Sequence, residues 1–219
     1  MTETNNLCFE VLPRRQKAIL DELAQASWIS DFYLAGGTAL ALQIGHRRSI
    51  DFDFFTEDKK FNLLLLKKRL LKLGHMHTRS ESEDTFNGSL NSISISFFSL
   101  PYKLIQKPLK YKNINLANKL DIAAMKLSAV SSRGSRKDFV DLYYLLDEYT
   151  LSEMITAYEK KYGKSTENIY CVLKGLVYFV DAEKLPMPRM LKNITWRSIK
   201  NRILLAQDKY VSQIRQENL

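Results

Sequence analysis

The stretch GGTALALQIGHRRSIDFDFF, residues 36–55, decides the fold, because several local signals follow one another within it. A short apolar run at residues 32–35 precedes it and predicts a strand that the glycine pair ends. Residues 38–44 predict a short helix. Residues 49–56, in which apolar and polar side chains alternate, predict a second strand. The stretch is therefore expected to fold as strand, glycine turn, helix and strand.

Two carboxylates share the open face of the second predicted strand. Side chains two apart on a strand point the same way, so Asp51 and Asp53 lie together, with Phe52 and Phe54 on the opposite face. Carboxylates placed in this way hold Mg²⁺, which bridges the phosphates of a nucleotide. The alternative is a solvated strand face whose acids pair with the preceding arginines. Because the aromatic side chains indicate a deeply packed strand, we favour a metal site at Asp51 and Asp53.

The glycine pair suits the close approach of a phosphate. Gly36 and Gly37 carry no side chain, and the helix that follows them offers unpaired N–H groups and the positive end of its dipole. Thr38 adds a hydroxyl donor. A plain turn with a helix cap is the alternative for all three residues. Taken together, the glycine pair and the carboxylate pair predict a nucleotide site.

The chain between this stretch and residue 100 predicts more sheet. Residues 61–73 predict a helix, and residues 75–83 predict a strand. Asn87-Gly88 has the composition of a hairpin turn, and residues 89–100 then alternate apolar side chains with serine. The first half of the chain is therefore expected to be a mixed α/β structure.

From about residue 115 the periodicity becomes helical. One buried helical face is expected to be formed by Leu116, Leu120, Ala123, Leu127 and Val130. Further helices are expected at residues 139–150, 151–162, 167–180 and 194–216. The sequence thus predicts an α+β protein, with an α/β core in residues 1–113 and a helical region in residues 114–219 packed on that core.

The helical half carries a second set of charged candidates. Lys119, Lys126 and Arg133 are seven residues apart and predict a cationic stripe that suits a triphosphate or a nucleic acid backbone. A row of snorkelling side chains at the border of a buried face is the alternative. Asp138 and Asp141 begin the next helix. They either complement its dipole or, in the case of Asp138, face an active site, and the residues alone leave both open.

Charge favours a polyanionic partner. The 219 residues have a formal net charge of +9. Residues 101–137 carry nine basic and one acidic side chain, and residues 183–219 carry eight and three. Such concentrations suit nucleic acid, although a solvated basic face is the alternative.

Cysteine usage and hydropathy bound the location. Cys8 and Cys171 lie far apart, which excludes a disulfide scaffold and a zinc site of ordinary spacing. The sequence has no apolar run long enough for a membrane span, and its first residues have no apolar signal core. We therefore expect a cytoplasmic protein with no membrane partner.

Two motifs resemble a known family. GGTALALQIGHRRSIDFDFF (36–55) and DIAAMKLSAVSSRGSRKDFVDLYYLL (121–146) resemble, in this order, the nucleotidyltransferase AbiEii/AbiGii toxin family. The resemblance spans roughly residues 14–180. It implies a DNA-polymerase-β-like nucleotidyltransferase fold, NTP binding, a divalent metal and transfer of a nucleotidyl group. Some members of the family that the chain resembles are toxins of abortive-infection toxin–antitoxin pairs, and some modify the acceptor end of tRNA.

The resemblance assigns roles residue by residue. It implies nucleotide binding by Gly36, Gly37, Thr38, Arg47, Ser49 and Arg133, with Arg48 as the alternative to Arg47. It implies metal binding by Asp51 and Asp53, and catalytic roles for Asp51, Asp53, Lys126 and Asp138. The family's last motif falls on Lys137, Asp138, Asp141 and Leu142.

One feature departs from the wider superfamily. Its classical members have a third carboxylate on a later strand, and the corresponding segment here, residues 91–96, reads NSISIS. The leading hypothesis is an Mg²⁺-dependent nucleotidyltransferase that acts on an acceptor hydroxyl of RNA, most plausibly tRNA. The missing acid motivates a second hypothesis, a nucleotide- or RNA-binding module without turnover. A third is a protein whose main role is to bind a partner, with a cognate antitoxin covering its cleft.

Overall fold

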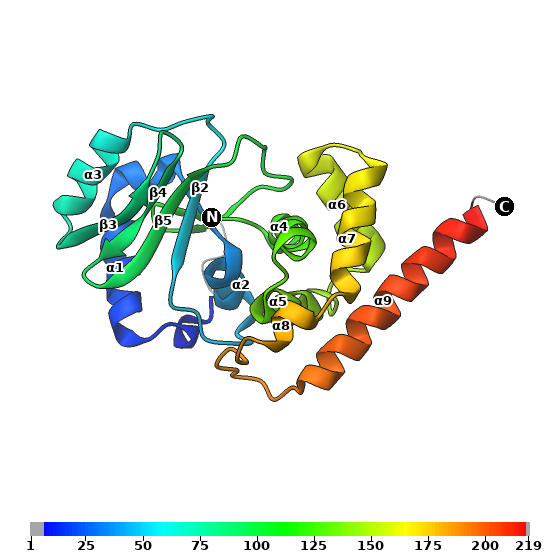
Figure 1. Ribbon diagram of the computed structural model, residues 1–219. Helices are drawn as coiled ribbons and strands as arrows, with labels where there is room; N and C mark the ends of the chain where they lie inside the picture. Colours follow the sequence, from blue (N-terminus) through cyan, green and yellow to red (C-terminus); the bar gives the residue numbers. More distant parts are fainter. Residues whose placement is uncertain (1–6, 218–219) are drawn as a thin grey trace. The chain divides into compact units, whose positions relative to one another are not determined.

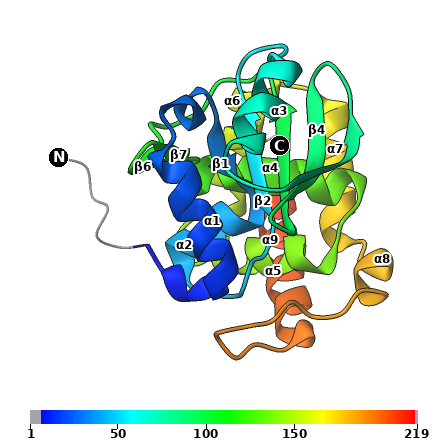
Figure 2. The ribbon, with the colours of Figure 1, turned by 90° about the vertical axis from the view of Figure 1, so that its left-hand side faces the viewer.

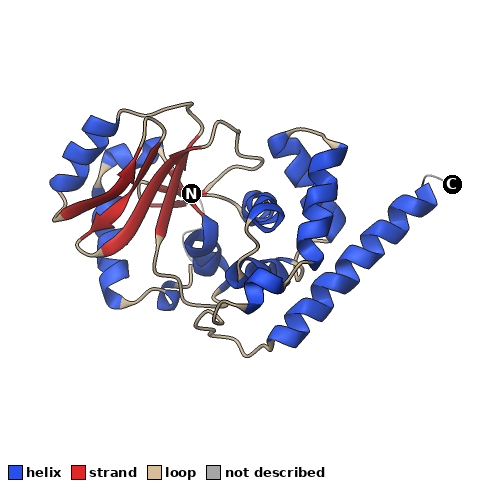
Figure 3. Ribbon diagram, in the orientation of Figure 1, coloured by secondary structure: helices blue, strands red, loops and turns tan. Residues whose placement is uncertain are grey.

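The computed structural model describes residues 7–217, and its internal contacts divide the chain into two compact units. Residues 1–6, to which the expectation of no signal core also applies, lie outside this range, as do residues 218–219. The first unit runs to Asn118 and the second starts at Lys119. Strands gather in the first unit, and the second is built from helices (Figure 3). Within residues 7–217, no helix combines the length and the apolar character needed to cross a membrane.

The first unit is organised around a sheet of seven strands in the order β3-β4-β5-β2-β1-β7-β6. The strands are β1 (Tyr33–Ala35), β2 (Phe52–Thr56), β3 (Met76–Glu81), β4 (Thr85–Leu90), β5 (Ile93–Ser99), β6 (Leu109–Tyr111) and β7 (Ile114–Leu116). β2 runs parallel to β5 and β1 runs parallel to β7, whereas the other neighbours are antiparallel. The predicted mixed sheet of an α+β fold is confirmed, with β2 near its centre.

Aromatic packing buries one face of this sheet. Phe52 and Phe54 of β2 are fully buried, and Phe54 stacks on Phe97 of β5 with ring centroids 5.1 Å apart. Helices α1 (Arg14–Gln25) and α3 (Leu63–Leu71) lie on one side of the strands in Figure 1 and in front of them in Figure 2. Because the side chains of β2 alternate, its other face is left with the half-buried carboxylates that the sequence predicts.

The remaining helical segments of the first unit are short. They are η1 (Phe9–Val11), η2 (Ser27–Asp31) and α2 (Gly36–Ile44). α2 follows β1 without a loop, and it ends at Gly45, whose φ of +69° is in the left-handed region. The middle of α2 is buried, so its position is fixed by the core rather than by solvent-exposed contacts.

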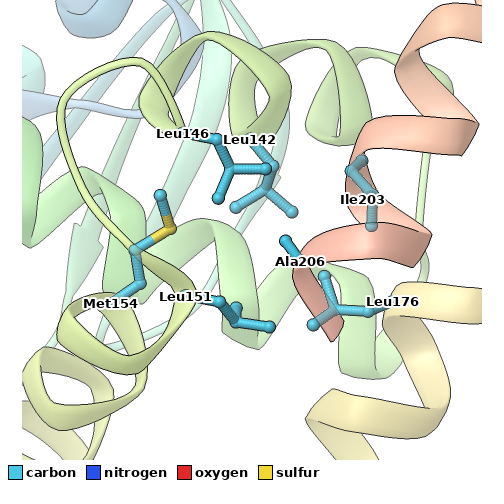
Figure 4. Close-up of a pocket in the computed structure, with 7 residues that line it drawn as sticks. All are labelled: Leu142, Leu146, Leu151, Met154, Leu176, Ile203 and Ala206. Carbon is cyan, nitrogen blue, oxygen red and sulfur yellow. The ribbon is translucent and has the colours of Figure 1, made fainter. Parts of the chain in front are cut away.

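The second unit packs its helices around apolar side chains. The helices are α4 (Lys119–Ser132), α5 (Arg136–Leu145), α6 (Leu151–Tyr162), α7 (Thr166–Val177), α8 (Val180–Glu183) and α9 (Trp196–Glu217). Apolar side chains from the α5–α6 region, α7 and α9 converge on one small gap in Figure 4: Leu142, Leu146, Leu151, Met154, Leu176, Ile203 and Ala206. This gap has no charged lining and is a feature of the core, not a candidate site.

A fully buried ion pair joins two of these helices. Nζ of Lys161 in α6 lies 3.0 Å from Oδ1 of Asp121 in α4, and both side chains are completely buried. Such a pair adds little net stability compared with apolar packing, but losing one partner leaves a charge in the core. The pair therefore fixes how α6 can lie against α4.

The hairpin turn predicted at Asn87-Gly88 is wrong, because both residues lie inside β4. The chain turns at Asn91 and Ser92, whose φ values of 48° and 67° match the two central positions of a type I′ turn. Gly88 has a different role, since a Cβ there would lie 2.4 Å from the carbonyl oxygen of His77 on β3. The glycine is needed for the close approach of two strands.

The boundary between the two regions also differs from the sequence-based one at residue 113. β6 and β7 form a hairpin around Lys112, whose φ is 51°, and β7 pairs with β1. Tyr111 donates a hydrogen bond to Asp21 of α1, which also holds Lys17 at 2.6 Å. Residues 114–116 therefore belong to the sheet rather than to the helical region, because hydrogen bonds along β1 outweigh the apolar spacing that indicated a helix.

We expect Gly88→Ala to lower the free energy of unfolding by about 1–3 kcal/mol, because the added methyl group would be forced against the neighbouring strand. Ser92→Gly should leave it unchanged or slightly higher, since relief of left-handed strain offsets the extra freedom of the unfolded chain. Urea unfolding followed by circular dichroism measures both. If Ser92→Gly lowered the free energy of unfolding more than Gly88→Ala, the result would favour a turn at Asn87-Gly88.

Candidate active site

The turn from β1 into α2 brings a glycine against a carboxylate. Gly36 has a φ of +65°, which is strained for any residue with a side chain. A Cβ at Gly36 would lie 3.2 Å from Oδ2 of Asp53 on β2. The interpretation of Gly36 as a left-handed turn residue is therefore confirmed for its backbone. The structure adds that the turn brings the backbone of Gly36 next to the Asp53 carboxylate.

Gly37 makes room for an arginine. A Cβ at Gly37 would lie 2.2 Å from a terminal nitrogen of Arg47, so any side chain here would displace the guanidinium. Arg47 is only 3% exposed and donates to the Arg48 carbonyl oxygen at 3.1 Å. The sequence leaves Arg47 and Arg48 as alternatives for the site arginine. The structure places Arg47 at the first turn of α2.

Thr38 and Ser49 hold the strand that carries the carboxylates. The Thr38 hydroxyl bonds to Ser49 Oγ at 2.7 Å and donates to the backbone carbonyl of Asp51. Both side chains are buried. Their hydroxyls therefore fix the segment that enters β2 against α2, and this contact sets the position of Asp51.

Asp53 lies beside the glycine turn, and Asp51 lies just before the same strand. Asp53 pairs with Ala35 of β1 on one side and with Ser96 of β5 on the other. Asp51 lies two residues earlier, just before β2, and both aspartates are half-buried. Mg²⁺ needs only one or two protein carboxylates when substrate phosphates and water complete its shell. The donor set of Asp51 and Asp53, next to a position without a Cβ, fits such an ion.

The strand paired with β2 presents a serine beside Asp53, in the segment where the sequence shows no third carboxylate. Ser96 is opposite Asp53 in the parallel β2–β5 pair, so the two side chains share a face. Asn87 of β4 follows in the same row and donates to Ser80 of β3 at 3.2 Å. Among residues 7–217, no three His, Cys, Asp or Glu side chains are grouped closely enough to hold a metal. Any metal at this site therefore depends on two carboxylates and its substrate.

In the second unit, one lysine lies between two buried carboxylates. Nζ of Lys126 in α4 is 2.8 Å from Asp138 Oδ1 and 2.6 Å from Asp141 Oδ2, both in α5. Lys126 is 5% exposed, and both acids are fully buried. A snorkelling lysine would keep its ammonium in water, so that alternative is wrong for Lys126. The ion cluster instead fixes α4 against α5.

Asp138 serves the cluster and its own helix. Its Oδ2 accepts from the backbone N–H of Ser135 at 3.2 Å and from the Ser135 hydroxyl at 2.5 Å, which forms a capping box at the start of α5. Burial alone raises the pKa of the Asp138 carboxyl, but the nearby Lys126 ammonium and the hydrogen bonds hold it below its usual range. The interpretation of Asp138 as an acid that serves the start of its own helix is therefore confirmed, and the structure adds its contact with Lys126. Its position in an active site stays a prediction.

The predicted cationic stripe does not form a single surface. Lys119 pairs with Glu148 in a partly exposed salt bridge, Lys126 is buried, and Arg133 is 70% exposed. The Nε of Arg133 lies 3.7 Å from Asp138 Oδ2. The prediction fails because spacing by seven places residues along one stripe of a helix but does not determine how deeply each is buried.

Sequence reasoning missed two supporting residues. Ser135 completes the capping box, and the pattern Ser-x-x-Asp before an apolar run was the signal that could have revealed it. Arg136 donates to the carbonyl oxygens of Ala182 and Glu183 at 2.9 Å and lies over the ring of Trp196. No local pattern links Arg136 to residues so far along the chain.

We expect Lys126→Met to lower the free energy of unfolding by about 3–5 kcal/mol, because two buried carboxylates would lose their shared cation. Lys119→Met is the matched control on the same helix. It should cost less than about 1 kcal/mol, because its pair with Glu148 is partly exposed. Urea unfolding measures both, and equal effects would show that the Lys126 cluster is not buried in solution.

The lowered pKa of Asp138 predicts how the variant Asp138→Asn depends on pH. The folded state binds the proton less tightly than the unfolded chain, whose Asp pKa is about 4. The contribution of Asp138 is therefore complete above that value and is lost as the pH falls through the folded pKa. Unfolding free energies of wild type and Asp138→Asn should differ most near neutral pH and converge below about pH 4. A gap that widens in acid would contradict the assignment.

Comparison with known proteins gives this geometry a context. The chain matches the family described as "Nucleotidyl transferase AbiEii toxin, Type IV TA system" over residues 18–114, which include the glycine turn and both strand carboxylates. It is 38% identical over 178 residues to the uncharacterized protein aq_aa25 of Aquifex aeolicus (strain VF5). That alignment covers 79% of this chain and 85% of the relative.

Two crystal structures from Helicobacter pylori share the fold. JHP933 superimposes with a TM-score of 0.56 at 15% identity, covering 94% of this chain and 98% of its own. A second structure, described as a candidate nucleotidyltransferase, gives a TM-score of 0.56 at 14% identity, covering 93% and 98%. By this family match, the chain belongs to the AbiEii family of nucleotidyltransferase toxins.

Proposed function

We propose that the protein transfers a nucleotidyl group from an NTP to an acceptor hydroxyl, with Mg²⁺ as cofactor. The observation that carries this proposal is the placement of Asp53 beside Gly36, at the start of α2. The start of α2 and the Asp53 carboxylate are then neighbours, and Asp51 lies two residues before Asp53. A triphosphate with its metal needs this combination of N–H donors and anionic oxygens.

The first unit supplies the nucleotide site in this proposal. The backbone of Gly36 and Gly37 approaches the phosphates, and the N–H groups at the start of α2 donate to them. Thr38 and Ser49 have a structural role in this proposal. The Thr38 hydroxyl bonds to Ser49 and to the backbone carbonyl of Asp51, and it thereby holds Asp51 in place. Arg47 adds positive charge at the same helix end.

Asp51 and Asp53 would hold the metal. Bound there, Mg²⁺ would supply positive charge to the phosphates of the nucleotide. The two carboxylates would fix the position of the metal. The acceptor hydroxyl would then attack the α-phosphorus in line, and pyrophosphate would leave. Ser96 leaves this arrangement one carboxylate short of the classical set.

The family motif in α4 and α5 supplies the remaining proposed roles. On the family resemblance we assign Lys126 to neutralising phosphate charge, a role in which its ammonium would be shared with Asp138 and Asp141. Asp138 acts here as a positioning residue, because both of its oxygens already accept hydrogen bonds. Arg133, which is largely exposed near Asp138, adds a second cation for the nucleotide.

RNA is the proposed acceptor, and tRNA is the most plausible form of it. The basic composition of residues 101–137 and 183–219 supports a polyanionic substrate. Family membership supports a toxin role with a cognate antitoxin, in abortive infection, and a cytoplasmic location goes with both.

A binding module without turnover is the second candidate. The serine at position 96 favours it, because a reduced metal site can retain nucleotide affinity while losing catalysis. The two candidates differ in one measurement, which is the transfer of label from NTP to RNA.

Each NTP, labelled at the α-phosphate, should be incubated with purified protein, Mg²⁺ and tRNA. We expect Asp51→Asn and Asp53→Asn each to reduce transfer by about 100-fold or more, because an anionic metal ligand becomes neutral. Ser96→Ala, the control in the neighbouring strand, should change the rate by less than about threefold. Its hydroxyl is not among the proposed ligands.

Thermal shift separates loss of binding from loss of folding. Both Asn variants should melt within a few degrees of wild type without ligand, since Asp51 and Asp53 are half-buried on the open face. They should show a smaller stabilisation by Mg²⁺ and NTP. Wild-type transfer in both variants would refute the proposed site, and nucleotide binding without any transfer would favour the binding module.

A further inference from the structure

An open groove in the second unit lies between the end of α4 and the face of α7. Its volume is about 370 Å³. The polar and aromatic side chains that line it are Ser131, Ser132, Arg133, Cys171, Lys174 and Tyr178. None of Cys171, Lys174 and Tyr178 was a candidate from sequence, and the family motifs do not include them.

Close helix packing makes the floor of this groove rigid. A Cβ at Gly175 of α7 would lie 2.4 Å from the carbonyl oxygen of Val130 in α4. Only glycine allows this approach, so the two helices touch along their backbones at this point. Gly134, with a φ of +47°, then turns the chain away from α4 toward α5. The walls are therefore formed by regular, tightly held backbone.

The charges in the groove are mainly positive. Arg133 is 70% exposed, and Lys174 is also exposed. The carboxylate of Asp181 lines the same groove but is paired with Lys184 at 2.7 Å. Two long cationic side chains are thus available to anionic groups in a concave space.

An aromatic ring stands beside these cations. Tyr178 follows the last residue of α7 and is 50% exposed. A half-exposed ring next to Lys and Arg is the combination on which single-stranded nucleic acids bind, with bases stacked and phosphates paired to cations. An NTP would need a closer cluster of donors for its three phosphates than one lysine and one arginine provide.

The groove is connected to the ion cluster of α4 and α5. Arg133 lines the groove and also approaches Asp138 Oδ2 at 3.7 Å, while Asp138 Oδ1 holds Lys126. A strand that lies along Tyr178 and Lys174 would therefore end near the cluster assigned to phosphate neutralisation.

We propose that this groove binds the single-stranded end of the acceptor nucleic acid, with a base on Tyr178 and a phosphate at Lys174, and with Arg133, the cation assigned to the nucleotide, at the end of the groove next to Asp138. The inference rests on the proposed nucleotidyl transfer and names the acceptor subsite for it. Binding is non-covalent and needs neither NTP nor metal, so it can be measured separately from transfer.

Cys171 reports directly on occupancy, because its exposed thiol lies in the groove. We expect an oligoadenylate of about ten nucleotides, at ten times its Kd, to slow alkylation of Cys171 by N-ethylmaleimide about tenfold. Peptide mass spectrometry follows the thiols individually. Cys8, in the first unit, is the internal control and should react at an unchanged rate.

Matched variants test the two contacts. Lys174→Ala should lower the slope of log Kd against log salt by about 0.7, whereas Lys164→Ala, an equal charge change at an exposed residue before α7, should not. Tyr178→Ser should weaken binding about tenfold, whereas Tyr178→Phe should bind as tightly as wild type, because stacking needs only the ring. Circular dichroism confirms that each variant is folded.

The probes distinguish the possible occupants. Protection by oligoadenylate and by the matched oligodeoxyadenylate supports a strand-binding groove, and protection by the RNA alone further identifies its natural ligand as RNA. Protection of Cys171 by ATP but by neither oligonucleotide would overturn the proposal, as would equal effects of Lys174→Ala and Lys164→Ala. The assay is repeated on Asp53→Asn. If Asp53→Asn binds the oligonucleotide but transfers no nucleotide, strand binding is independent of the reaction. The groove proposal can then be judged even if the proposed reaction is wrong.

Discussion

The candidate nucleotide site depends on the absence of a Cβ at two consecutive positions. At Gly36 this absence allows the backbone to lie next to the Asp53 carboxylate, and at Gly37 it admits the guanidinium of Arg47. A side chain at either position would move a charged group of the site. Because the glycines begin α2 directly after β1, the same two residues determine both the local backbone and the distance between the helix end and the carboxylates.

A central strand gives this arrangement its rigidity. β2 is held by β1 and β5 through hydrogen bonds, and Phe52 and Phe54 anchor it from the buried face. The hydroxyls of Thr38 and Ser49 then fix the segment just before it. A carboxylate on such a strand loses little further freedom when it binds a ligand, which favours binding of a metal–nucleotide complex.

In the second unit, buried ion pairs fix how the helices pack against one another. Lys126 pairs with two buried carboxylates and Lys161 with one, and each of these contacts ties α4 to another helix. Such clusters add little net stability but specify one arrangement, because any other packing would strand a charge in the core. Arg133 extends one cluster to the surface, where the groove of Lys174 and Tyr178 begins.

The sequence by itself determined the strand–turn–helix–strand unit, the open face of Asp51 and Asp53, and most helices of the second half. These follow from alternation, helical period and glycine, which are local properties of the chain. Tertiary structure decided the hairpin at Asn91, the strand pairing of β7, the burial of Lys126, and the choice of Arg47 at Gly37. Spacing along the chain shows which residues share a face. What that face meets, and whether water reaches it, depends on packing between residues far apart in sequence.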